Sequence, residues 1–337
     1  PVAEQMGVVL SNTATSVNIK ERLDFSCALF DPLGRLIANA PHLPIHLGSM
    51  GESIQTVIRE RGGKIKPGES YALNAPYNGG THLPDITVIT PVFDDKKKNV
   101  LFYVASRGHH ADIGGTTPSS IPPFSKYIEE EGILIDNFLL TKNGKLRETQ
   151  LRKLLTSSKY PARNPEQNIE DFRAQIAANN RGAKELLNII GKYGIKTVHS
   201  YMNFVRINAK ECVEEVISKL KSGKYVLKLD HGGEIHVSIS VKKKSRIVKV
   251  DFTGTSAPLS SNFNAPTSIT KACVLYVFRC LVKDSIPLND GCLEPIDIII
   301  PKKCFLNPEY PSAVVAGNVE TAQAITSALF GALNKMA

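Results

Sequence analysis

The chain has 337 residues, a net charge of +9 at pH 7 and 42% hydrophobic residues. This length supports about two domains with a sizeable buried core, which excludes a mini-protein that depends on disulfides or metals to fold. Charged residues make up only 22% of the chain, and the lysine runs at 96–98 and 242–244 lie between strand-like segments, where charged turns are expected. The composition therefore predicts a globular protein and no binding to nucleic acid.

Six scattered cysteines form no C-x-x-C pair, which argues against both a disulfide framework and a thiolate zinc site. We therefore expect a reducing, cytoplasmic setting. Residues 1–5 lack the basic and apolar regions of a signal peptide, and no apolar run is long enough for a membrane span. Both ends fall within helix-like sequence that has no capping or stop signal, so we expect the chain to be part of a longer protein.

Short apolar runs broken by Gly and Pro dominate residues 22–160, and they are typical of strands joined by long irregular loops. Loops of this length inside a compact domain are often functional. One helix, from Met50 to Arg61, is expected before Gly62 and Gly63. The predicted strands cover residues 27–30, 35–37, 71–73, 86–92 and 100–104.

The pattern becomes helical at residue 164, where Asn164 can cap a helix that has Pro165 in its first position and Gln167 three residues after the cap. A second helix is predicted over residues 197–220. Its apolar residues are expected to form a stripe that faces the core. This stripe consists of Phe204, Ile207, Cys212, Val216 and Leu220.

Strict alternation of apolar and polar residues returns after Gly223 and predicts a three-stranded antiparallel meander. A helix over residues 267–281 and a strand over residues 296–300 are expected to follow. The sequence therefore predicts an α+β fold with mixed or antiparallel sheets, long functional loops and a central helical segment. Its segments are residues 1–160 with the candidate site, 161–222, and 223–337.

Five of the eight histidines lie between residues 42 and 110, in the loop-rich first segment. His82 and Asp85 are separated by a turn-forming Pro84, and a turn would bring the imidazole and the carboxylate to the same side. Imidazole nitrogen and carboxylate oxygen together suit Zn, Mn or Fe(II). This segment therefore predicts a divalent metal ion, although hydrogen-bonded turn histidines would fit the same pattern.

A second polar cluster, residues 106–115, contains Arg107, His109, His110 and Asp112 between glycines. It can supply a further metal ligand, an acid–base group and an anion-binding arginine. Neighbouring residues of an extended chain point in opposite directions, so only one of the two histidines is expected to reach a metal ion.

Two later loops, residues 262–266 and 317–321, carry Asn and Glu side chains that can line a site, although turn formation explains them equally well. The sequence contains no phosphate-binding loop, dinucleotide fingerprint, nucleophile elbow or H-E-x-x-H motif. If a nucleotide takes part in the reaction, it is expected to bind elsewhere.

At these same residues the chain resembles the hydantoinase B/5-oxoprolinase family, along nearly its whole length. The resemblance implies the B-type subunit of an ATP-dependent cyclic-amide hydrolase that acts on 5-oxo-L-proline or an N-methylhydantoin. In such a hetero-oligomer, a hydantoinase A-type subunit with an actin-like ATPase fold would bind ATP and Mg and phosphorylate the substrate. The alternatives are the large subunit of an acetone- or acetophenone-type carboxylase, and a non-catalytic scaffold that docks the ATPase. The matching stretches are residues 18–30, 40–50, 80–92, 106–116, 251–256, 264–266 and 317–321.

The resemblance also implies residue roles. A metal ion would be held by Glu21, His82, Asp85 and one of His109 or His110. Ring opening needs a positioned water and a proton acceptor, for which His46 and Asp112 are the candidates. Arg107 would hold the substrate carboxylate through a bidentate contact. Further contacts to the substrate are expected from His42, Asn264, Asn318 and Glu320.

Overall fold

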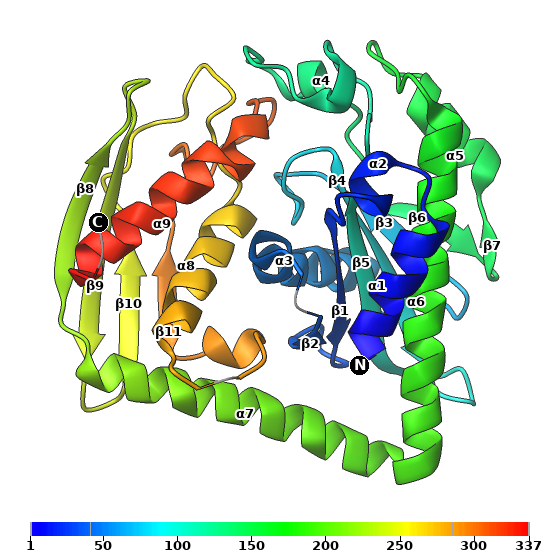
Figure 1. Cartoon of the computed structure of the whole chain (residues 1–337), viewed down its shortest axis with the longest axis horizontal. Helices are drawn as coiled ribbons and strands as arrows, with labels where there is room; N and C mark the ends of the chain where they lie inside the picture. The colour runs from blue at the N-terminus through cyan, green and yellow to red at the C-terminus, as the bar shows by residue number, and fades with distance from the viewer. Residues whose placement is uncertain (1, 41, 285, 336–337) are drawn as a thin grey trace.

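The computed structural model describes residues 2–40, 42–284 and 286–335 of the chain. In this part of the chain there are two separate β-sheets, of seven and four strands, each covered by helices. The long helix α7 (Ile195–Lys219) connects the two resulting lobes along one edge of the molecule (Figure 1). The arrangement confirms the predicted α+β class.

The first lobe is built on an antiparallel sheet. Its strands are β1 (Phe25–Phe30), β2 (Leu36–Asn39), β3 (Ser70–Leu73), β4 (Asp85–Phe93), β5 (Val100–His109), β6 (Phe138–Lys142) and β7 (Lys145–Leu146). Their order is β2-β1-β5-β4-β3-β6-β7, which places β5 and β4 near the centre. The sequence analysis predicted the first five strands and missed β6 and β7.

The second lobe contains the predicted meander. Its strands are β8 (Gly223–Lys228), β9 (Glu234–Lys242), β10 (Ile247–Asp251) and β11 (Ile296–Ile299). The first three pair in antiparallel fashion, and β11 joins β10 in parallel. Alternate residues Ile235, Val237 and Ile239 of β9 are buried against the helices of this lobe. The period of two in the sequence therefore reflects a sheet that is covered on one face.

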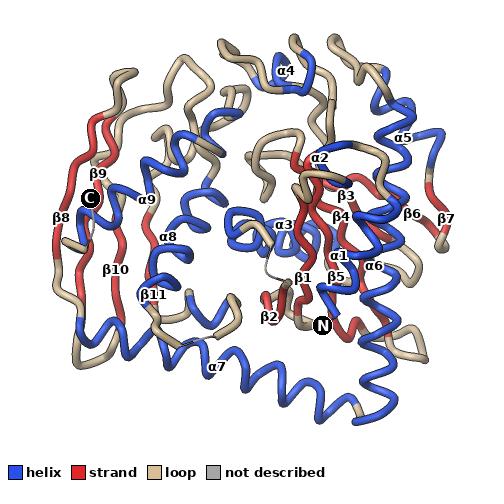
Figure 2. Tube along the Cα trace, in the orientation of Figure 1, coloured by secondary structure: helices blue, strands red, loops and turns tan. Residues whose placement is uncertain are grey.

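Helices cover both faces of the first sheet, because alternate residues of β1 face different helices: Cys27 and Leu29 contact α1 and α6, whereas Ala28 and Phe30 contact α3. Figure 2 shows α3 and α8 between the two groups of strands. None of the described helices combines the length and apolar character needed to cross a lipid bilayer. The remaining helices are α1 (Val2–Thr13), α2 (Val17–Lys20), α3 (Pro44–Arg61), α4 (Ile128–Glu131), α5 (Glu148–Thr156), α6 (Pro165–Tyr193), α8 (Thr267–Leu281) and α9 (Glu320–Leu333), with the 3-10 helices η1 (Pro118–Ser120), η2 (Asp290–Cys292) and η3 (Val315–Asn318).

Helix boundaries agree with the sequence where a capping residue marks them. Asn164 caps α6 as predicted, since its Oδ1 accepts a hydrogen bond from the Gln167 N–H at 3.2 Å. Helix α3 begins at Pro44, six residues before the predicted start at Met50, because proline is well suited to the first helical position. The extra residues place His46 on a helix rather than in a loop.

The predicted core-facing stripe of α7 is correct only in part: Leu220 is buried and Cys212 and Val216 pack against the same core, but Phe204 does not. Phe204 is 60% exposed, and the buried residues of this helix are Val198, Met202, Ala209, Val213 and Ile217. The helix spans two lobes, so different faces are buried along its length, and one regular stripe does not describe it.

The two lobes meet where α3 crosses α8. A Cβ atom on Gly48 would lie 2.7 Å from the Ala272 Cα, so only glycine permits this close approach. Lys271 of α8 forms an ion pair with Glu52 of α3 at 2.7 Å. Asp290 also joins the lobes, because its Oδ2 accepts a hydrogen bond from the Leu36 N–H at 2.7 Å.

Asp290 makes the stability of the fold depend on pH. Burial raises the pKa of its carboxyl group to about 6, with a further contribution from Asp31. An unfolded aspartate titrates near pH 4, so the contribution of Asp290 is complete below about pH 4 and is lost as the pH rises to about 6. We expect the stability difference between Asp290→Asn and wild type to shift by about 2–3 kcal/mol in favour of the variant between pH 4.5 and pH 8. Urea unfolding at pH 4.5 and pH 8 measures this shift, and Asp297→Asn, at an exposed position, is the control. A stability difference that is equal at the two pH values would contradict the prediction.

Candidate functional site

Asp85 lies at the centre of the candidate site and is brought there by a turn and a strand pair. It begins β4 and is paired with His109, the last residue of β5. The Asp85 N–H donates to the His82 carbonyl at 3.2 Å, which closes the turn around Pro84. The predicted turn is therefore present, and it brings His82 and Asp85 to the same side.

Three imidazoles surround the Asp85 carboxylate. Its Oδ2 lies 3.1 Å from Nε2 of His82 and 3.1 Å from Nε2 of His46, and its Oδ1 lies 3.0 Å from Nδ1 of His109. These four side chains come from the turn before β4, the start of β4, the first turn of α3 and the end of β5. His82, Asp85 and His109 are all buried, and each offers a ligand atom within 4.8 Å of the others.

The electrostatics of the cluster favour an ionised Asp85. Burial opposes ionisation, but His82, His46 and the hydrogen bond from His109 outweigh it and hold the pKa of Asp85 well below its usual range. For His109, burial opposes protonation, yet the hydrogen bond to Asp85 raises the pKa of the imidazole. The site therefore combines one buried anion with three potential proton donors or metal ligands.

Asp24 is a member of the site that the sequence analysis missed. Its Oδ2 lies 3.8 Å from His109 Nδ1, and its Oδ1 lies 3.9 Å from His46 Nε2. The His109 N–H also donates to the Asp24 carbonyl at 3.0 Å, which fixes the entry into β1 beside the end of β5. Glu21, the predicted ligand, is exposed at the end of α2, and neither Glu21 nor Asp24 belongs to the group of potential ligands within the described ranges, which is His82, Asp85 and His109. The available signal was the position of Asp24 directly before a buried strand.

His110 points away from the cluster. Its Nε2 lies 3.1 Å from Gln175 Oε1, and its Nδ1 accepts from Asn168 Nδ2 at 3.1 Å. Burial lowers the pKa of this imidazole. The alternation of the extended chain thus sends His109 to the site and His110 toward α6, in agreement with the expectation that only one of them reaches it.

Arg107 is completely buried beneath the site. Its Nε donates to Thr87 Oγ1 at 2.7 Å, one terminal nitrogen donates to Ser49 Oγ, and the other donates to Ser53 Oγ at 3.0 Å. Burial lowers the pKa of the guanidinium to about 10. Every guanidinium nitrogen therefore holds a hydroxyl group, and Arg107 connects α3 to the sheet instead of facing an open cavity.

Four other predicted residues lie apart from Asp85. Asp112 pairs with Arg163 at 2.7 Å and accepts backbone N–H groups within its loop. Asn264 is fully buried in the second lobe, where its amide donates to three backbone carbonyls. His42 accepts the Cys27 N–H at 3.0 Å, and Glu320 is exposed at the start of α9. The structure gives the first three a local structural role.

Asn318 is the contribution of the second lobe to the cluster. Its Nδ2 lies 3.3 Å from His82 Nε2 and 3.3 Å from Asp85 Oδ2. Its Oδ1 and the Nδ1 of His82 are buried and have no hydrogen-bond partner among the described residues. Unpartnered buried polar atoms are destabilising, and a ligand or an ordered water would satisfy these two.

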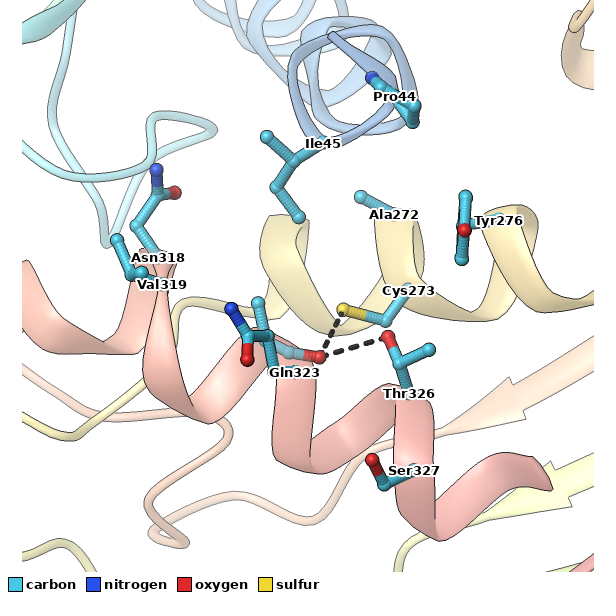
Figure 3. Close-up of a pocket in the computed structure, with 11 residues that line it drawn as sticks. Pro44, Ile45, Ala272, Cys273, Tyr276, Asn318, Val319, Gln323, Thr326 and Ser327 are labelled. Carbon is cyan, nitrogen blue, oxygen red and sulfur yellow. Dashed lines mark hydrogen bonds between the residues drawn. The ribbon is translucent and has the colours of Figure 1, made fainter. Parts of the chain in front are cut away.

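A groove of about 530 Å³ adjoins the cluster through Asn318. Figure 3 shows Asn318 at one end of the groove and Ile45, the neighbour of His46, across from it. The groove runs between α3, α8 and α9, and none of its lining residues is charged. Ile45, Ala272 and Val319 supply apolar surface, whereas Tyr276 and Gln323 supply polar groups. This lining suits a small, largely uncharged molecular group.

Comparison with known proteins places the chain in a family. Residues 1–337 match the family described as Hydantoinase B/oxoprolinase. The chain is 44% identical over 360 residues to 5-oxoprolinase 1 of Arabidopsis thaliana, an alignment that covers 100% of the chain and 28% of that protein. A protein of Pseudomonas sp., whose name assigns it to the B-type component of a D-/L-hydantoinase, is 28% identical and is covered over 59% of its length, with 98% of this chain aligned.

Two solved structures share the fold. The ATP-dependent caprolactamase from Pseudomonas jessenii superposes with a TM-score of 0.85 at 23% identity, over 98% of this chain and 58% of that chain. Nucleotide-free acetone carboxylase gives a TM-score of 0.85 at 18% identity, over 99% of this chain and 46% of its own. From the match along its whole length, the chain belongs to the hydantoinase B/oxoprolinase family.

Proposed function

We propose that this chain is the B-type part of an ATP-dependent cyclic-amide hydrolase that opens 5-oxo-L-proline to L-glutamate. The observation that carries the proposal is the buried, ionised Asp85 surrounded by His46, His82 and His109. The 44% identity to a protein named 5-oxoprolinase supports this choice of substrate.

ATP is assigned to a partner, a hydantoinase A-type ATPase subunit or domain. The sequence contains no phosphate-binding loop. The chain spans 28% of the Arabidopsis 5-oxoprolinase but 59% of the Pseudomonas hydantoinase component, so the second relative is roughly half as long as the first. This difference in length is what we expect if the ATPase is fused in one relative and separate in the other.

The chemistry explains why a phosphorylated substrate needs this site. A five-membered lactam is an unreactive amide, and a phosphoryl group on its carbonyl oxygen turns that oxygen into a leaving group. Water can then attack the ring carbon, and the C–N bond breaks as the ring nitrogen takes up a proton. A second water displaces inorganic phosphate from the acyl phosphate that remains, which leaves the glutamate carboxylate. His46 is the candidate to move this proton. Asp85 Oδ2 at 3.1 Å and Ser26 Oγ at 3.3 Å occupy its two ring nitrogens, so it would have to exchange one of these contacts for water or substrate.

The cluster fits a divalent ion such as Zn²⁺, Mn²⁺ or Fe²⁺. Two imidazoles and an ionised carboxylate present ligand atoms within 4.8 Å of one another. His82, Asp85 and His109 would hold the ion, with Asp24 at the edge of the site. A bound ion would act as a Lewis acid that stabilises negative charge on oxygen.

Two substitutions test whether Asp24 or Glu21 contributes to metal binding. We expect Asp24→Asn to weaken Mn²⁺ binding by about 10-fold or more, because its carboxylate flanks both His46 and His109. Glu21→Gln, the matched control, should change the affinity by less than about 2-fold. Calorimetric titration of the purified variants measures both values. A loss with Glu21→Gln and none with Asp24→Asn would contradict the assignment.

Function is tested in the complex with the ATPase. The chain is co-expressed with its A-type partner and supplied with ATP and 5-oxo-L-proline, and glutamate and phosphate are measured. Glutamate formation that disappears in His46→Ala supports the proposal. Turnover only with a ketone and bicarbonate would indicate a carboxylase, and a complex that binds no stoichiometric metal and needs none of these side chains would indicate a scaffold. Either result overturns the proposal.

A further inference from the structure

Glu131 is a buried carboxylate that none of the chemistry above uses. It ends α4 in the first lobe and is 0% exposed. Within the described ranges, no nitrogen of a basic side chain lies within 4 Å of it, so its charge is balanced by hydrogen bonds alone. Its Oε1 accepts from Ser125 Oγ at 2.9 Å and from the N–H groups of Val314 and Val315 at 3.0 Å each.

The backbone that carries Glu131 is tightly held. A Cβ atom on Gly115 would lie 2.7 Å from the Glu130 carbonyl oxygen and 2.8 Å from the Glu131 carbonyl carbon, so the two segments are in direct backbone contact. The Thr116 N–H also donates to the Glu130 carbonyl at 2.7 Å. The carboxylate is thus presented from a rigid part of the first lobe toward the second.

The partners of Glu131 lead directly to the candidate site. Val315 is the first residue of η3 and Asn318 is the last. The Gly317 N–H donates to the Val314 carbonyl at 2.9 Å, so this short helix moves as one unit with the residues that Glu131 holds. Asn318 in turn places its amide 3.3 Å from both His82 and Asp85.

Holding a loop with a buried carboxylate costs free energy, because the charged group loses its contact with water. Burial raises the pKa of Glu131 to about 7, which reflects the cost of keeping it ionised. A loop that needed only packing could be filled by an apolar side chain at lower cost. Two adjacent N–H groups and a hydroxyl instead converge on one oxygen, an arrangement that fixes the direction in which the loop continues.

We propose that Glu131 is a positioning residue that acts through Val314 and Val315 to hold Asn318 against His82 and Asp85. This inference goes beyond the proposed function. It depends on the proposed function only in the experiment that measures metal binding. Glu131 does not touch substrate or metal. Its effect on the site passes entirely through Asn318.

A double-mutant cycle tests this route. We expect Glu131→Gln and Asn318→Ala each to weaken Mn²⁺ binding by about 10-fold, and the double variant to be no weaker than Asn318→Ala alone. The control is Glu69→Gln, because Glu69 is also a buried carboxylate that accepts a backbone N–H, from Lys66, and a hydroxyl, from Tyr71, but its partners lie in the first lobe. This control should stay within about 2-fold of wild type.

A second readout needs no metal. In the metal-free protein, ¹⁵N NMR of the imidazoles should show the His82 signal displaced in the same direction by Glu131→Gln and Asn318→Ala, and unchanged by Glu69→Gln. Ser125→Ala, which removes one donor but keeps the carboxylate, should displace the signal less, and it replaces Glu131→Gln if that variant does not fold.

Additive losses of about 100-fold in the double variant, or a His82 signal that moves with Asn318→Ala but not with Glu131→Gln, would overturn the inference. If wild type binds no Mn²⁺, the metal part of the proposed function fails, and the metal-free NMR comparison still decides the role of Glu131.

Discussion

Asp85→Asn is expected to lower the affinity for Mn²⁺ or Zn²⁺ by about 100-fold or more, the larger of the effects foreseen at the site. The carboxylate is the only group among the described residues that contacts His46, His82 and His109 together. An asparagine at this position has no negative charge. Its amide N–H groups would also replace a carboxylate oxygen that accepts from the imidazoles in the wild-type protein. Metal content after dialysis and titration with Mn²⁺ measure the loss.

The matched control for this substitution is Asp94→Asn. The Asp94 carboxylate lies at the surface and accepts from the Lys98 N–H at 2.8 Å, so the substitution removes one charge far from the histidines. Its metal affinity should equal that of wild type. If Asp85→Asn retained full metal content, the His82–Asp85 turn would not be the metal site, and the proposed function would lose its principal support.

The turn that contains His82 and Asp85 could be predicted from the sequence, because it depends only on neighbouring residues. Pro84 forces a turn, and the turn alone brings His82 beside Asp85. Alternation along β5 likewise allows only one of two adjacent histidines to face the site. Which of the two faces the site depends on α6, because Asn168 and Gln175 of this helix bind His110 from the other side. The sequence of residues 106–115 alone cannot predict a contact with that helix.

Parts of the site that depend on helix ends were predicted less well. His46 was recognised as a candidate, but its place beside Asp85 depends on α3 beginning at Pro44. The choice between Glu21 and Asp24 depends on where α2 ends, since Leu23 adopts a positive φ of 55° and turns the chain so that Asp24 faces His109. Sequence spacing cannot resolve a difference of three residues across such a turn.

Contacts between the lobes were the least accessible to sequence reasoning. Asn318 lies 233 residues after Asp85, and the polar loop that carries it was equally consistent with an ordinary turn. The same holds for Glu131, which was not singled out because its acidic neighbours resemble a solvated face. The positions of both residues depend on how the two lobes pack together, which no local sequence pattern records.

Gly317→Ala is expected to have the largest effect on the packing of the 317–321 loop against the 262–266 loop and to lower the free energy of unfolding by about 3 kcal/mol or more. A Cβ atom on Gly317 would lie 2.0 Å from the Asn264 carbonyl oxygen and 2.8 Å from the Ala265 Cα. These are backbone atoms of a loop that Asn264 braces with four side-chain hydrogen bonds, so they cannot move away cheaply.

The same substitution should reach the site, because Gly317 precedes Asn318 in η3 and its displacement carries the Asn318 amide away from Asp85. Urea unfolding and Mn²⁺ titration of the variant measure the two effects. The control is Gly191→Ala in α6, where an added Cβ meets nothing within 4 Å, and helix propensity should raise stability there by up to about 1 kcal/mol. If the Gly317→Ala protein unfolded and bound Mn²⁺ like wild type, the prediction would be contradicted. The contact between the 262–266 and 317–321 loops would then not be what places Asn318 beside Asp85.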